Sequence, residues 1–465
     1  MAICDEKIHC IGIGGIGVSS VAGICSQLGA KVSGCDLRDN EQTQILRTLG
    51  CQCYGQHSIE HLEDISLVVY SSAIKADHPE LRHARKLEIP TLTRAQMLAR
   101  LQQGKKTVAV AGAHGKTTTT WIAANALITA GLLPTVMVGG NVDLPGGNWS
   151  VGPGDYFITE VDESDGSLLE FRPTYSIITN VDLEHLDYYR DFDHIRETFS
   201  RYIHQTQPNG YVIACADDPE LQSLLGDWPG KKISYGISDS ADFRARCIRL
   251  ESDKSIFEVV TGSNSLGEFV LSLPGEHNVQ NAVSVVALAC QLDIPMEDIR
   301  RAFINTTGVG RRLQLQGKSC GVSVWTDYAH HPREIRATLK AARRIANKRL
   351  IGIFQPHRYT RTQKLNVEFG GAFDELDHLL LTPIYAASEK PIEGVDSSLI
   401  AGEIEKQGMV GCEMASDLGT VAERLLDMVQ PGDTVITLGA GDVNMVGPEF
   451  LAMLEETNNM RQVTN

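Results

Sequence analysis

The sequence predicts an α/β protein with three domains, each built on a mainly parallel β-sheet. Apolar runs of strand length alternate with amphipathic helical stretches through most of the chain, which is typical of this class. A polar segment, LQQGKKT, and a segment rich in glycine and arginine, GVGRRLQLQGK, interrupt the alternation. Because domains usually span roughly 100 to 200 residues, a chain of 465 residues fits three of them. We place them at 1–103, 104–312 and 313–465.

The composition favours a cytoplasmic protein. Hydrophobic residues make up 42% of the chain and charged residues 22%, which is ordinary for a globular protein with buried cores. The formal net charge of -16 argues against a nucleic-acid partner, because phosphate backbones are bound by an excess of Lys and Arg. No basic N-terminal segment precedes an apolar run, and no uncharged stretch is long enough to span a bilayer, so we expect no membrane insertion. The 11 cysteines lie mostly in apolar settings, and we expect reduced, packed thiols.

The first domain is expected to be Rossmann-like, with strands in the apolar runs 7–14, 31–37 and 66–72. Between the first strand and the following helix, a phosphate would meet exposed N–H groups at Gly12, Gly14, Gly15 and Gly17. Asp36 ends the second strand, where an acid can hold a ribose hydroxyl, and Ser71 and Ser72 end the third. The glycines leave open whether the diphosphate belongs to NAD or to a nucleotide sugar. They also fit a helix that merely packs close to a strand.

The central domain is expected to be P-loop ATPase-like, because GAHGKTTTT follows the strand-like run TVAVA and precedes a helix. A standard G-x-x-x-x-G-K-[ST] loop would place a glycine at Val110, so this loop is shortened and begins at Gly112. Backbone N–H groups from Gly112 to Lys116 can wrap phosphates, and the Lys116 ammonium can neutralise charge. Thr117 can offer a hydroxyl to magnesium, and Thr118 extends the loop.

Two further strands of the central domain end in residues that could bind magnesium. The run 156–165 carries four acids, namely Glu160, Asp162, Glu163 and Asp165. The next strand, in 175–181, is followed by Asp182, Glu184 and His185. Strand ends of a parallel sheet meet at one edge, and Mg²⁺ prefers oxygen ligands, so we expect a metal site there. The alternative is a solvated acidic loop.

The third domain, also expected to be Rossmann-like, has apolar runs at 322–331, 350–358, 379–385 and 434–442. A helix should begin at Pro332 and turn Ile335, Leu339 and Ala342 inward. His330 and His331 lie in the turn before it. A compact positive cluster ends the second run, with His357, Arg358 and Arg361. Arginine is suited to gripping a carboxylate or phosphate, although arginines in a loop are often simply solvated.

Seven motifs follow one another over nearly the whole chain: GAHGKTTTT, TEVDESD, TNVDLEHLD, GEHNVQNAVSVVALA, GVGRRLQ, DYAHHP and FQPHRYTR. In this order they resemble the Mur ligases of peptidoglycan synthesis, and in particular the alanine-adding branch of that family. The resemblance implies an ATP-dependent and Mg²⁺-dependent ligase that joins L-alanine to the lactyl carboxylate of UDP-N-acetylmuramate through an acyl phosphate. We therefore expect small-molecule partners and a monomer or homodimer.

The resemblance also implies roles for individual residues. The ATP phosphates would be held by Gly112, Ala113, His114, Gly115, Lys116, Thr117 and Thr118. Magnesium would lie among Thr117, Glu160 and His185, and the nucleotide would contact Asn278, Asn281 and Arg312. The UDP-sugar would be bound by Gly12, Gly14, Gly15, Gly17, Asp36, Ser71 and Ser72 in the first domain. His330, Arg358 and Arg361 would contact the muramate and its reacting carboxylate, and with Lys116 they form the expected catalytic set. The stretch from Gly439 to Asp442 would border the amino-acid pocket.

Other functions compete with this interpretation. Some Mur ligases carry a carbamylated lysine downstream of the histidine, but DYYRDFDHIRETFSRYIH contains no lysine, which fits the alanine-adding branch. A recycling ligase that joins UDP-N-acetylmuramate to a murein peptide is the nearest alternative. A NAD(P)-dependent oxidoreductase would leave the GKTTTT loop unexplained, and a nucleotide-binding regulatory protein would leave the magnesium residues idle.

Overall fold

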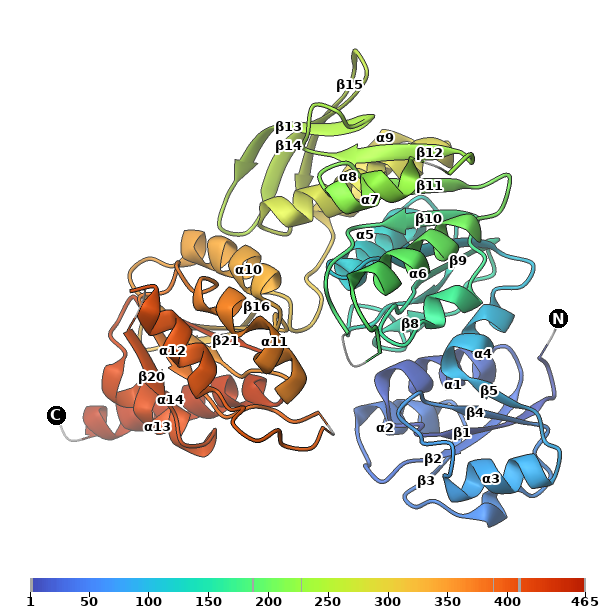
Figure 1. The fold of residues 1–465 in the computed structure, drawn as a ribbon, viewed down its shortest axis with the longest axis horizontal. Coiled ribbons are helices and arrows are strands. Elements are labelled where there is room, and N and C mark those ends of the chain that lie inside the picture. The colour runs from blue at the N-terminus through green and yellow to red at the C-terminus, as the bar shows by residue number, and fades with distance from the viewer. Residues whose placement is uncertain (1–2, 186–187, 227, 388, 409–410, 464–465) are drawn as a thin grey trace. The chain divides into compact units, whose positions relative to one another are not determined.

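The computed structural model describes residues 3–185, 188–226, 228–387, 389–408 and 411–463. Within these residues the strands form three sheets, each made from one consecutive part of the chain (Figure 1). The chain divides into two compact units, and the first comprises Met1–Cys247, Phe257–Val270 and Asn278–Thr307. The second comprises Ile248–Ile256, Leu271–His277 and Gly308–Asn465. The predicted class, three α/β domains with mainly parallel sheets, is confirmed, whereas the boundaries at 103 and 312 stay predictions.

The first sheet has the order β3-β2-β1-β4-β5, and all neighbouring strands are parallel. Its strands are β1 (Lys7–Ile11), β2 (Lys31–Cys35), β3 (Gln52–Tyr54), β4 (Leu67–Tyr70) and β5 (Thr91–Thr93). Its helices are α1 (Ile16–Gln27), α2 (Glu41–Thr48), the short 3-10 helix η1 (Ile59–Leu62), α3 (Pro79–Lys86) and α4 (Arg94–Leu101). The three apolar runs predicted β1, β2 and β4. The edge strands β3 and β5 are short and incompletely buried, so they lack an apolar run.

The second sheet has the order β15-β14-β13-β12-β11-β10-β6-β9-β7-β8. Neighbours from β7 to β13 are parallel, and β8 is antiparallel to β7. The strands are β6 (Lys106–Ala111), β7 (Thr135–Met137), β8 (Trp149–Ser150), β9 (Tyr156–Glu160), β10 (Tyr175–Ile178), β11 (Tyr211–Cys215), β12 (Lys232–Gly236), β13 (Phe243–Leu250), β14 (Ser255–Thr261) and β15 (Asn264–Leu271). The helices are α5 (Lys116–Thr129), η2 (Ser167–Glu170), α6 (Phe192–His204), α7 (Pro219–Leu225), α8 (Glu276–Gln291) and α9 (Met296–Ile304).

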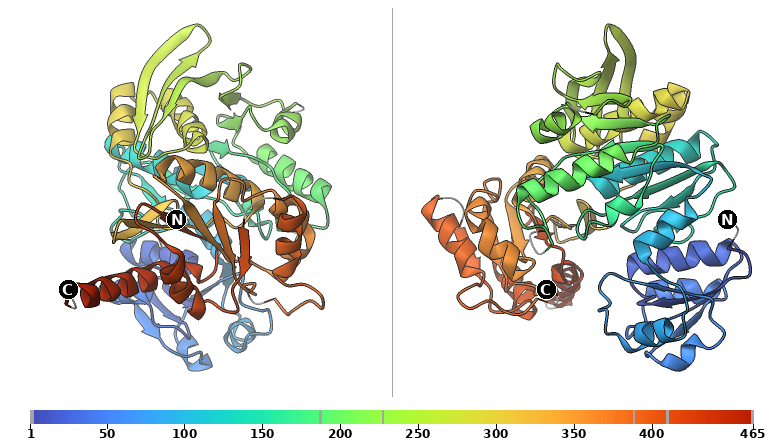
Figure 2. Two further views of the ribbon diagram at one scale, coloured as in Figure 1. Left: turned by 90° about the vertical axis from the view of Figure 1, so that its left-hand side faces the viewer. Right: turned by 45° about the vertical axis from the view of Figure 1, so that its right-hand side comes forward.

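The centre of this sheet explains why its strands could be recognised. Every residue of β6 after Lys106 is buried, because helices cover both faces of the sheet and a strand buried on both faces reads as a continuous apolar run. Figure 2 shows α5 and α6 on opposite faces of the sheet. The strands β13 and β15 were not predicted, because charged and polar residues interrupt them, as in FRARCIRL.

The third sheet has the order β16-β17-β21-β18-β19-β20, in which β16 is antiparallel to β17 and the other neighbours are parallel. Its strands are β16 (Gln314–Ser319), β17 (Val322–Asp327), β18 (Leu350–Phe354), β19 (His378–Leu381), β20 (Gly411–Met414) and β21 (Thr434–Leu438). Its helices are α10 (Pro332–Ile345), α11 (Tyr359–Gly370), α12 (Ser398–Lys406), α13 (Gly419–Met428), η3 (Val443–Met445) and α14 (Val446–Val463).

The side chains of β18 alternate between two hydrophobic cores, one on each face of the third sheet. Leu350 and Phe354 belong to a cluster with residues of α10, α11 and α12. Ile351 and Ile353 belong to a second cluster with residues of α13 and α14. Successive side chains of a strand point to opposite faces, so one fully buried strand supports both layers of helices. The sheet can then hold its loops at the carboxyl edge, where ligands bind.

Helix α10 begins at Pro332 as predicted, and Ile335, Leu339 and Ala342 are buried. The His331 side chain accepts a hydrogen bond from the Arg333 N–H, so it caps the helix.

The 11 cysteines are free thiols, but Cys4, Cys247 and Cys320 are exposed, which corrects the expectation of packed thiols for these three. Of the helices in the described ranges, none is both long and apolar enough to cross a bilayer.

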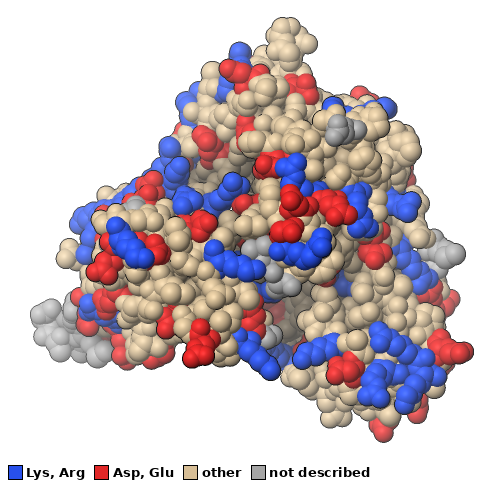
Figure 3. Space-filling view, viewed as in Figure 1, with Lys and Arg blue, Asp and Glu red and all other residues tan. Residues whose placement is uncertain are grey.

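The charged side chains are interspersed on the face drawn in Figure 3, with Lys and Arg lying among Asp and Glu. Positive residues gather in the last turn of α3, which carries His83, Arg85 and Lys86. Although the net charge is -16, this face is therefore not one continuous acidic surface.

Candidate active site

The shortened phosphate loop joins β6 to α5, and its two glycines adopt backbone conformations that other residues rarely adopt. Gly112 has φ of 131°, and a Cβ added there would lie 2.1 Å from Thr179 Oγ1. Gly115, the residue before α5, has φ of 80°, and its added Cβ would lie 3.0 Å from Asn281 Oδ1. Gly112 therefore requires glycine for conformation and for space, whereas Gly115 requires it mainly for conformation, because only the end of the Asn281 side chain lies close to it.

The residues after β10 hold the loop from one side. The Asn180 side chain accepts the His114 N–H at 2.8 Å and donates to the His114 carbonyl at 3.1 Å. The Asn180 carbonyl accepts the Ala113 N–H at 3.2 Å, and Thr179 Oγ1 donates to the His114 carbonyl at 2.6 Å. In this structure these bonds occupy the N–H groups of Ala113 and His114, two of the five that were expected to wrap phosphates.

Sequence reasoning did not single out Thr179 and Asn180. The sequence feature that could have revealed them is their position as two polar residues directly after the buried strand β10. This strand lies next to β6 in the sheet. His114 was predicted to contact the ATP phosphates. In this structure its side chain contacts a carboxylate instead, because its Nε2 lies 2.9 Å from Asp182 Oδ2. Asp182 thus positions the loop in this structure.

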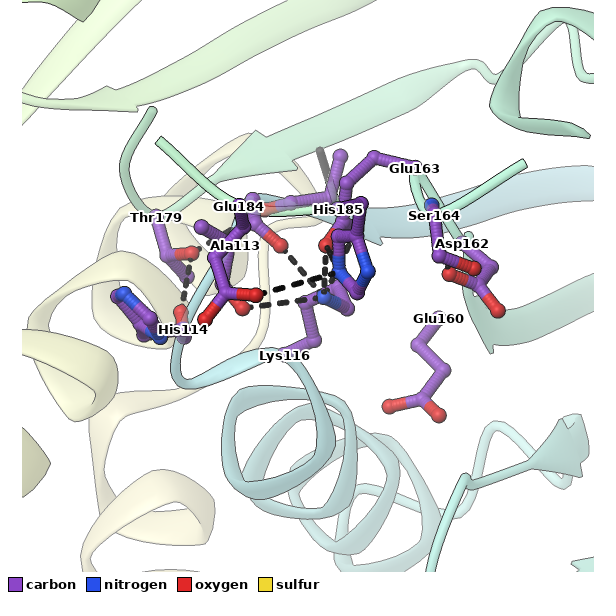
Figure 4. Close-up of polar contacts among 12 residues, drawn as sticks. Ala113, His114, Lys116, Glu160, Asp162, Glu163, Ser164, Thr179, Glu184 and His185 are labelled. Carbon is purple, nitrogen blue, oxygen red and sulfur yellow. Dashed lines mark hydrogen bonds and ion pairs between the residues drawn. The ribbon is translucent and has the colours of Figure 1, made fainter. Parts of the chain in front are cut away.

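The partly buried side chain of Lys116 lies at the centre of the site, with 17% of its surface exposed. Its Nζ donates to the carbonyls of Gly112 and Ala113 at 2.6 and 3.2 Å and lies 2.8 Å from Glu163 Oε2. Burial on its own lowers the pKa of Lys116, but the negative charges of Glu163 and Asp162 outweigh it and raise the pKa. A positive charge is therefore in place beside the phosphate loop (Figure 4).

Glu163 joins the lysine to His185. His185 Nε2 lies 3.1 Å from Glu163 Oε1, and Tyr189 donates its hydroxyl to the Glu163 carbonyl at 2.6 Å. Burial opposes the charge of His185, but the hydrogen bond and the charge of Glu163 raise its pKa. Glu163 was one of the four acids predicted at the strand end, but of these acids only Glu160 was assigned a role. The structure makes it the shared partner of Lys116 and His185, as Figure 4 shows.

Glu160 and Thr117 offer a set of hard oxygen ligands. Thr117 Oγ1 donates to Glu160 Oε2 at 2.8 Å, so the first turn of α5 meets the end of β9. An added Cβ on Gly139, after β7, would lie 1.5 Å from Glu160 Oε1, and the carboxylate therefore rests against bare backbone. Hydroxyl and carboxylate oxygens suit Mg²⁺, so these residues fit the metal that the sequence predicted.

The other acids of the run have different partners. Asp162 accepts the Ser164 N–H at 3.0 Å, and its other oxygen lies 3.5 Å from Arg94 Nη2. Asp165 accepts the Ser167 N–H at 3.0 Å. The acidic cluster therefore divides into loop-forming carboxylates and carboxylates that face the phosphate loop.

The two predicted asparagines share one face of α8, as expected from their spacing. Asn281 Nδ2 lies 3.5 Å from Asn278 Oδ1, and the mostly buried Asn281 rests against Gly115. Arg312 belongs to the second compact unit, where its guanidinium lies 5.3 Å from the centre of the Tyr328 ring. The nucleotide contacts of these three residues stay predictions.

The glycine turn of the first domain is tied to the ends of β1 and β2. Gly12 has φ of 81° and donates to the Cys35 carbonyl at 2.9 Å. Gly14 donates to Asp36 Oδ2 at 3.0 Å, and Asp36 Oδ1 accepts the Arg38 N–H at 3.0 Å. Asp36 thus holds the turn in this structure, and a ribose hydroxyl would share its carboxylate.

Four more candidates lie around this turn. Gly15 donates to the Gly12 carbonyl at 3.1 Å and precedes α1. An added Cβ on Gly17 would lie 2.7 Å from Arg94 Cδ. Ser71 and Ser72 follow β4, and Ser71 Cβ would lie 3.6 Å from an added Cβ on Gly12. Arg94 was not predicted, although it lies beside both Gly17 and Asp162.

The candidates of the third domain meet around His357. The rings of His330 and His357 have centres 5.6 Å apart, and Arg361 Nη1 lies 3.1 Å from His357 Nδ1. Arg358 has φ of 73°, and its N–H donates to the Tyr385 carbonyl at 2.8 Å. The structure therefore brings His330, Arg358 and Arg361 into one cluster, whose role toward the substrate stays a prediction.

The glycines after β21 adjoin the half-buried Arg311. Arg311 Nη2 donates to the carbonyls of Gly439 and Gly441 at 2.6 and 2.9 Å. Asp442 accepts a hydrogen bond from Gln355 at 2.7 Å. This segment therefore has a defined shape at the carboxyl edge of the third sheet.

A strand, a glycine loop and a helix around a partly buried lysine, with carboxylates at the adjoining strand ends, define a nucleoside-triphosphate-binding α/β protein. The chain belongs to the Mur ligase family. Residues 7–106 match the model described as Mur ligase family, catalytic domain, residues 110–289 match the Mur ligase middle domain, and residues 311–441 match the Mur ligase, glutamate ligase domain.

Individual relatives cover nearly the whole chain. The UDP-N-acetylmuramate--L-alanine ligase of Syntrophus aciditrophicus is 43% identical over 456 residues, which are 98% of this chain and 95% of that protein. The crystal structure of UDP-N-acetylmuramate-alanine ligase from Thermotoga maritima has a TM-score of 0.82 at 29% identity and covers 97% of this chain and 99% of its own. A murein peptide ligase from Psychrobacter arcticus shares the fold, with a TM-score of 0.72 at 23% identity over 97% of this chain and 98% of its own.

Proposed function

We propose that this protein joins L-alanine to the lactyl carboxylate of UDP-N-acetylmuramate at the expense of ATP, in the synthesis of peptidoglycan precursors. The observation that carries the proposal is Lys116, which lies 2.8 Å from Glu163 beside a loop whose glycines, 112 and 115, both have positive φ. The relative from Syntrophus aciditrophicus supports the choice of substrates. A cytoplasmic location and a monomeric or homodimeric state are part of the same proposal.

The chemistry explains why the reaction needs a triphosphate. A carboxylate is a poor acylating agent, so the lactyl carboxylate first attacks the γ-phosphate of ATP, and ADP leaves. The amine of alanine then attacks the carbonyl of the acyl phosphate, and phosphate leaves from the tetrahedral intermediate. Lys116 would stabilise the charge that develops during phosphoryl transfer, and Arg358, Arg361 and His330 would hold the carboxylate in position.

Magnesium would be held by Thr117 and Glu160, with His185 nearby, and would neutralise charge on the ATP phosphates. Glu163 keeps Lys116 charged and in place, as the short contact between them indicates. Thr179 and Asn180 hold the loop through the backbone N–H and carbonyl of His114. These residues act mainly by positioning.

The proposal predicts phosphate release from ATP only when UDP-N-acetylmuramate and a small L-amino acid are both present, with L-alanine the best. Phosphate release would be measured with L-alanine, D-glutamate and a murein tripeptide in parallel, and NADPH oxidation would be followed separately. A preference for the tripeptide would instead identify a recycling ligase. Release with D-glutamate and the alanyl precursor would identify the next ligase of the pathway, and nicotinamide turnover would reject the ligase proposal.

A second prediction concerns the residues that we expect to lie around the magnesium ion. Glu160→Ala and His185→Ala should each raise the Mg²⁺ concentration needed for half-maximal turnover by at least about tenfold, because each removes a group next to the metal site. Magnesium titrations of phosphate release measure this change. Asp165→Ala is the matched control, because Asp165 belongs to the same acidic run but bonds to Ser167. Unchanged titrations for both Glu160→Ala and His185→Ala would mean that the acids only form a solvated loop.

A further inference from the structure

A second group of chemically reactive side chains lies in the first domain, away from the phosphate loop. It surrounds the fully buried carboxylate of Glu80, near the start of α3. Its other members come from β1, the end of β2 and the segment around η1, and they are His9, Cys35, His57 and His61. Nothing in the ligase reaction uses these residues.

The spacing of four of these groups is that of a metal coordination shell. Glu80 Oε1 lies 3.4 Å from Cys35 Sγ, 3.6 Å from His9 Nε2 and 3.3 Å from His61 Nδ1. The four ligand atoms all lie within 4.8 Å of one another. Zinc binds nitrogen, oxygen and sulfur at about 2.0 to 2.3 Å, so neighbouring ligands of a tetrahedral ion lie about 3.3 to 3.8 Å apart.

His9 shows that this arrangement is incomplete without a ligand. Its side chain is fully buried, and Nδ1 lies 2.9 Å from Ser33 Oγ. The opposite ring nitrogen, Nε2, makes no hydrogen bond within the described residues and faces Glu80. A buried polar atom without a hydrogen bond calls for an explanation, and a bound cation supplies one. The bond to Ser33 is also the outer contact that orients a histidine ligand.

The carboxylate of Glu80 has outer partners as well. His57 Nδ1 lies 3.1 Å from Glu80 Oε2, and the Ser58 N–H donates to Glu80 Oε1 at 3.1 Å. In the structure described the Cys35 thiol donates to Glu80 Oε2 at 3.1 Å. A bound metal would replace that proton and turn repulsion between thiolate and carboxylate into shared attraction.

We propose that the first domain binds one Zn²⁺ ion through His9 Nε2, Cys35 Sγ, His61 Nδ1 and Glu80 Oε1. The mixture of imidazole, thiolate and carboxylate favours zinc over Mg²⁺, which prefers oxygen ligands. The ion would join β1, β2, η1 and α3. The Cys35 carbonyl accepts the N–H groups of Gly12 and Ile13, so the same ion would also stiffen the glycine turn.

Cobalt is a suitable probe, because a Co²⁺–thiolate bond gives a charge-transfer absorption that Mg²⁺-type oxygen sites cannot give. Metal-stripped full-length protein, without nucleotide, would be titrated with Co²⁺ and then with Zn²⁺. We expect saturation at about one equivalent, a thiolate band with the visible absorption of tetrahedral cobalt, displacement of cobalt by zinc, and a higher Tm with zinc.

Three variants locate the site. Cys35→Ser should remove the thiolate band, and His61→Ala should lower the cobalt affinity by more than about 100-fold, because each loses a direct ligand. Cys53→Ser is the matched control, because Cys53 is half-buried in the neighbouring strand β3 and bonds to the Thr43 carbonyl at 3.8 Å. Circular dichroism checks that each variant is folded. If Cys35→Ser does not fold, His61→Ala decides.

Absence of a thiolate band in the wild-type protein would overturn the proposal. So would a folded Cys35→Ser variant that keeps the band, or unchanged cobalt affinity in His61→Ala. The zinc site and the ligase function can fail separately, because the cobalt titration contains no ATP or UDP-sugar and the phosphate-release assay does not report on Cys35.

Discussion

Lys116→Ala is expected to lower ATP-dependent phosphate release by about 10³-fold, because it removes the buried charge that faces the transferred phosphate. Steady-state phosphate release with UDP-N-acetylmuramate and L-alanine measures the loss. The variant should also unfold at a lower temperature, since Glu163 lies 2.8 Å from Lys116 Nζ and loses that partner inside the protein. The change in Tm is measured on the same samples.

A double variant separates these two effects. Adding Glu163→Gln to Lys116→Ala removes the negative charge that has lost its lysine partner and should restore part of the lost stability without restoring turnover. Lys106→Ala is the control, because Lys106 lies exposed at the start of β6, on the same strand as the loop. Near-normal turnover in a folded Lys116→Ala variant would reject the assignment of this loop to ATP.

Gly112→Ala is expected to reduce kcat/KM for ATP by at least about 100-fold, because the new methyl group would displace the phosphate loop by a large fraction of an ångström or more. An added Cβ at Gly112 would lie 2.1 Å from Thr179 Oγ1 and 3.0 Å from the backbone nitrogen of Asn180. The alanine would also be strained at φ of 131°. Initial rates at varied ATP concentration measure the effect.

Gly104→Ala distinguishes crowding from backbone strain. Gly104 also has a positive φ, of 84°, but nothing lies within 4 Å of its added Cβ. It should therefore cost some stability and leave kcat/KM for ATP nearly unchanged. Equal losses of kcat/KM in Gly104→Ala and Gly112→Ala would contradict the role we assign to close packing around the loop.

The class of fold could be predicted because its strands are buried on both faces. In β6 and β18, burial on both sides demands apolar residues at successive positions, and such runs are visible in a single sequence. The missed strands, such as β5 and β13, are half-buried or interrupted by charge. Their pairing with a neighbour supplies the information that their own residues lack.

The sequence allowed us to predict which segments form the candidate site, but not which residues of those segments contact one another. The glycines, Lys116 and Thr117 follow from local chemistry, because a phosphate loop requires these residue types at this spacing. Asn180 and Thr179 are 60 or more residues from the loop, and ordinary polar residues after a strand give no sign of which backbone they will hold. The partner of Lys116 could likewise have been any of four neighbouring acids.

The sequence by itself determined the α/β class, the most deeply buried strands, the position of the phosphate loop and the family to which the chain belongs, since each depends on residues close together or on motifs in order. The tertiary structure alone decided which distant groups meet. It placed Glu163 between Lys116 and His185, and it brought His9, Cys35, His61 and Glu80 together. The physical reason is that a parallel sheet aligns strand ends that are far apart in the chain, and no local pattern records that alignment.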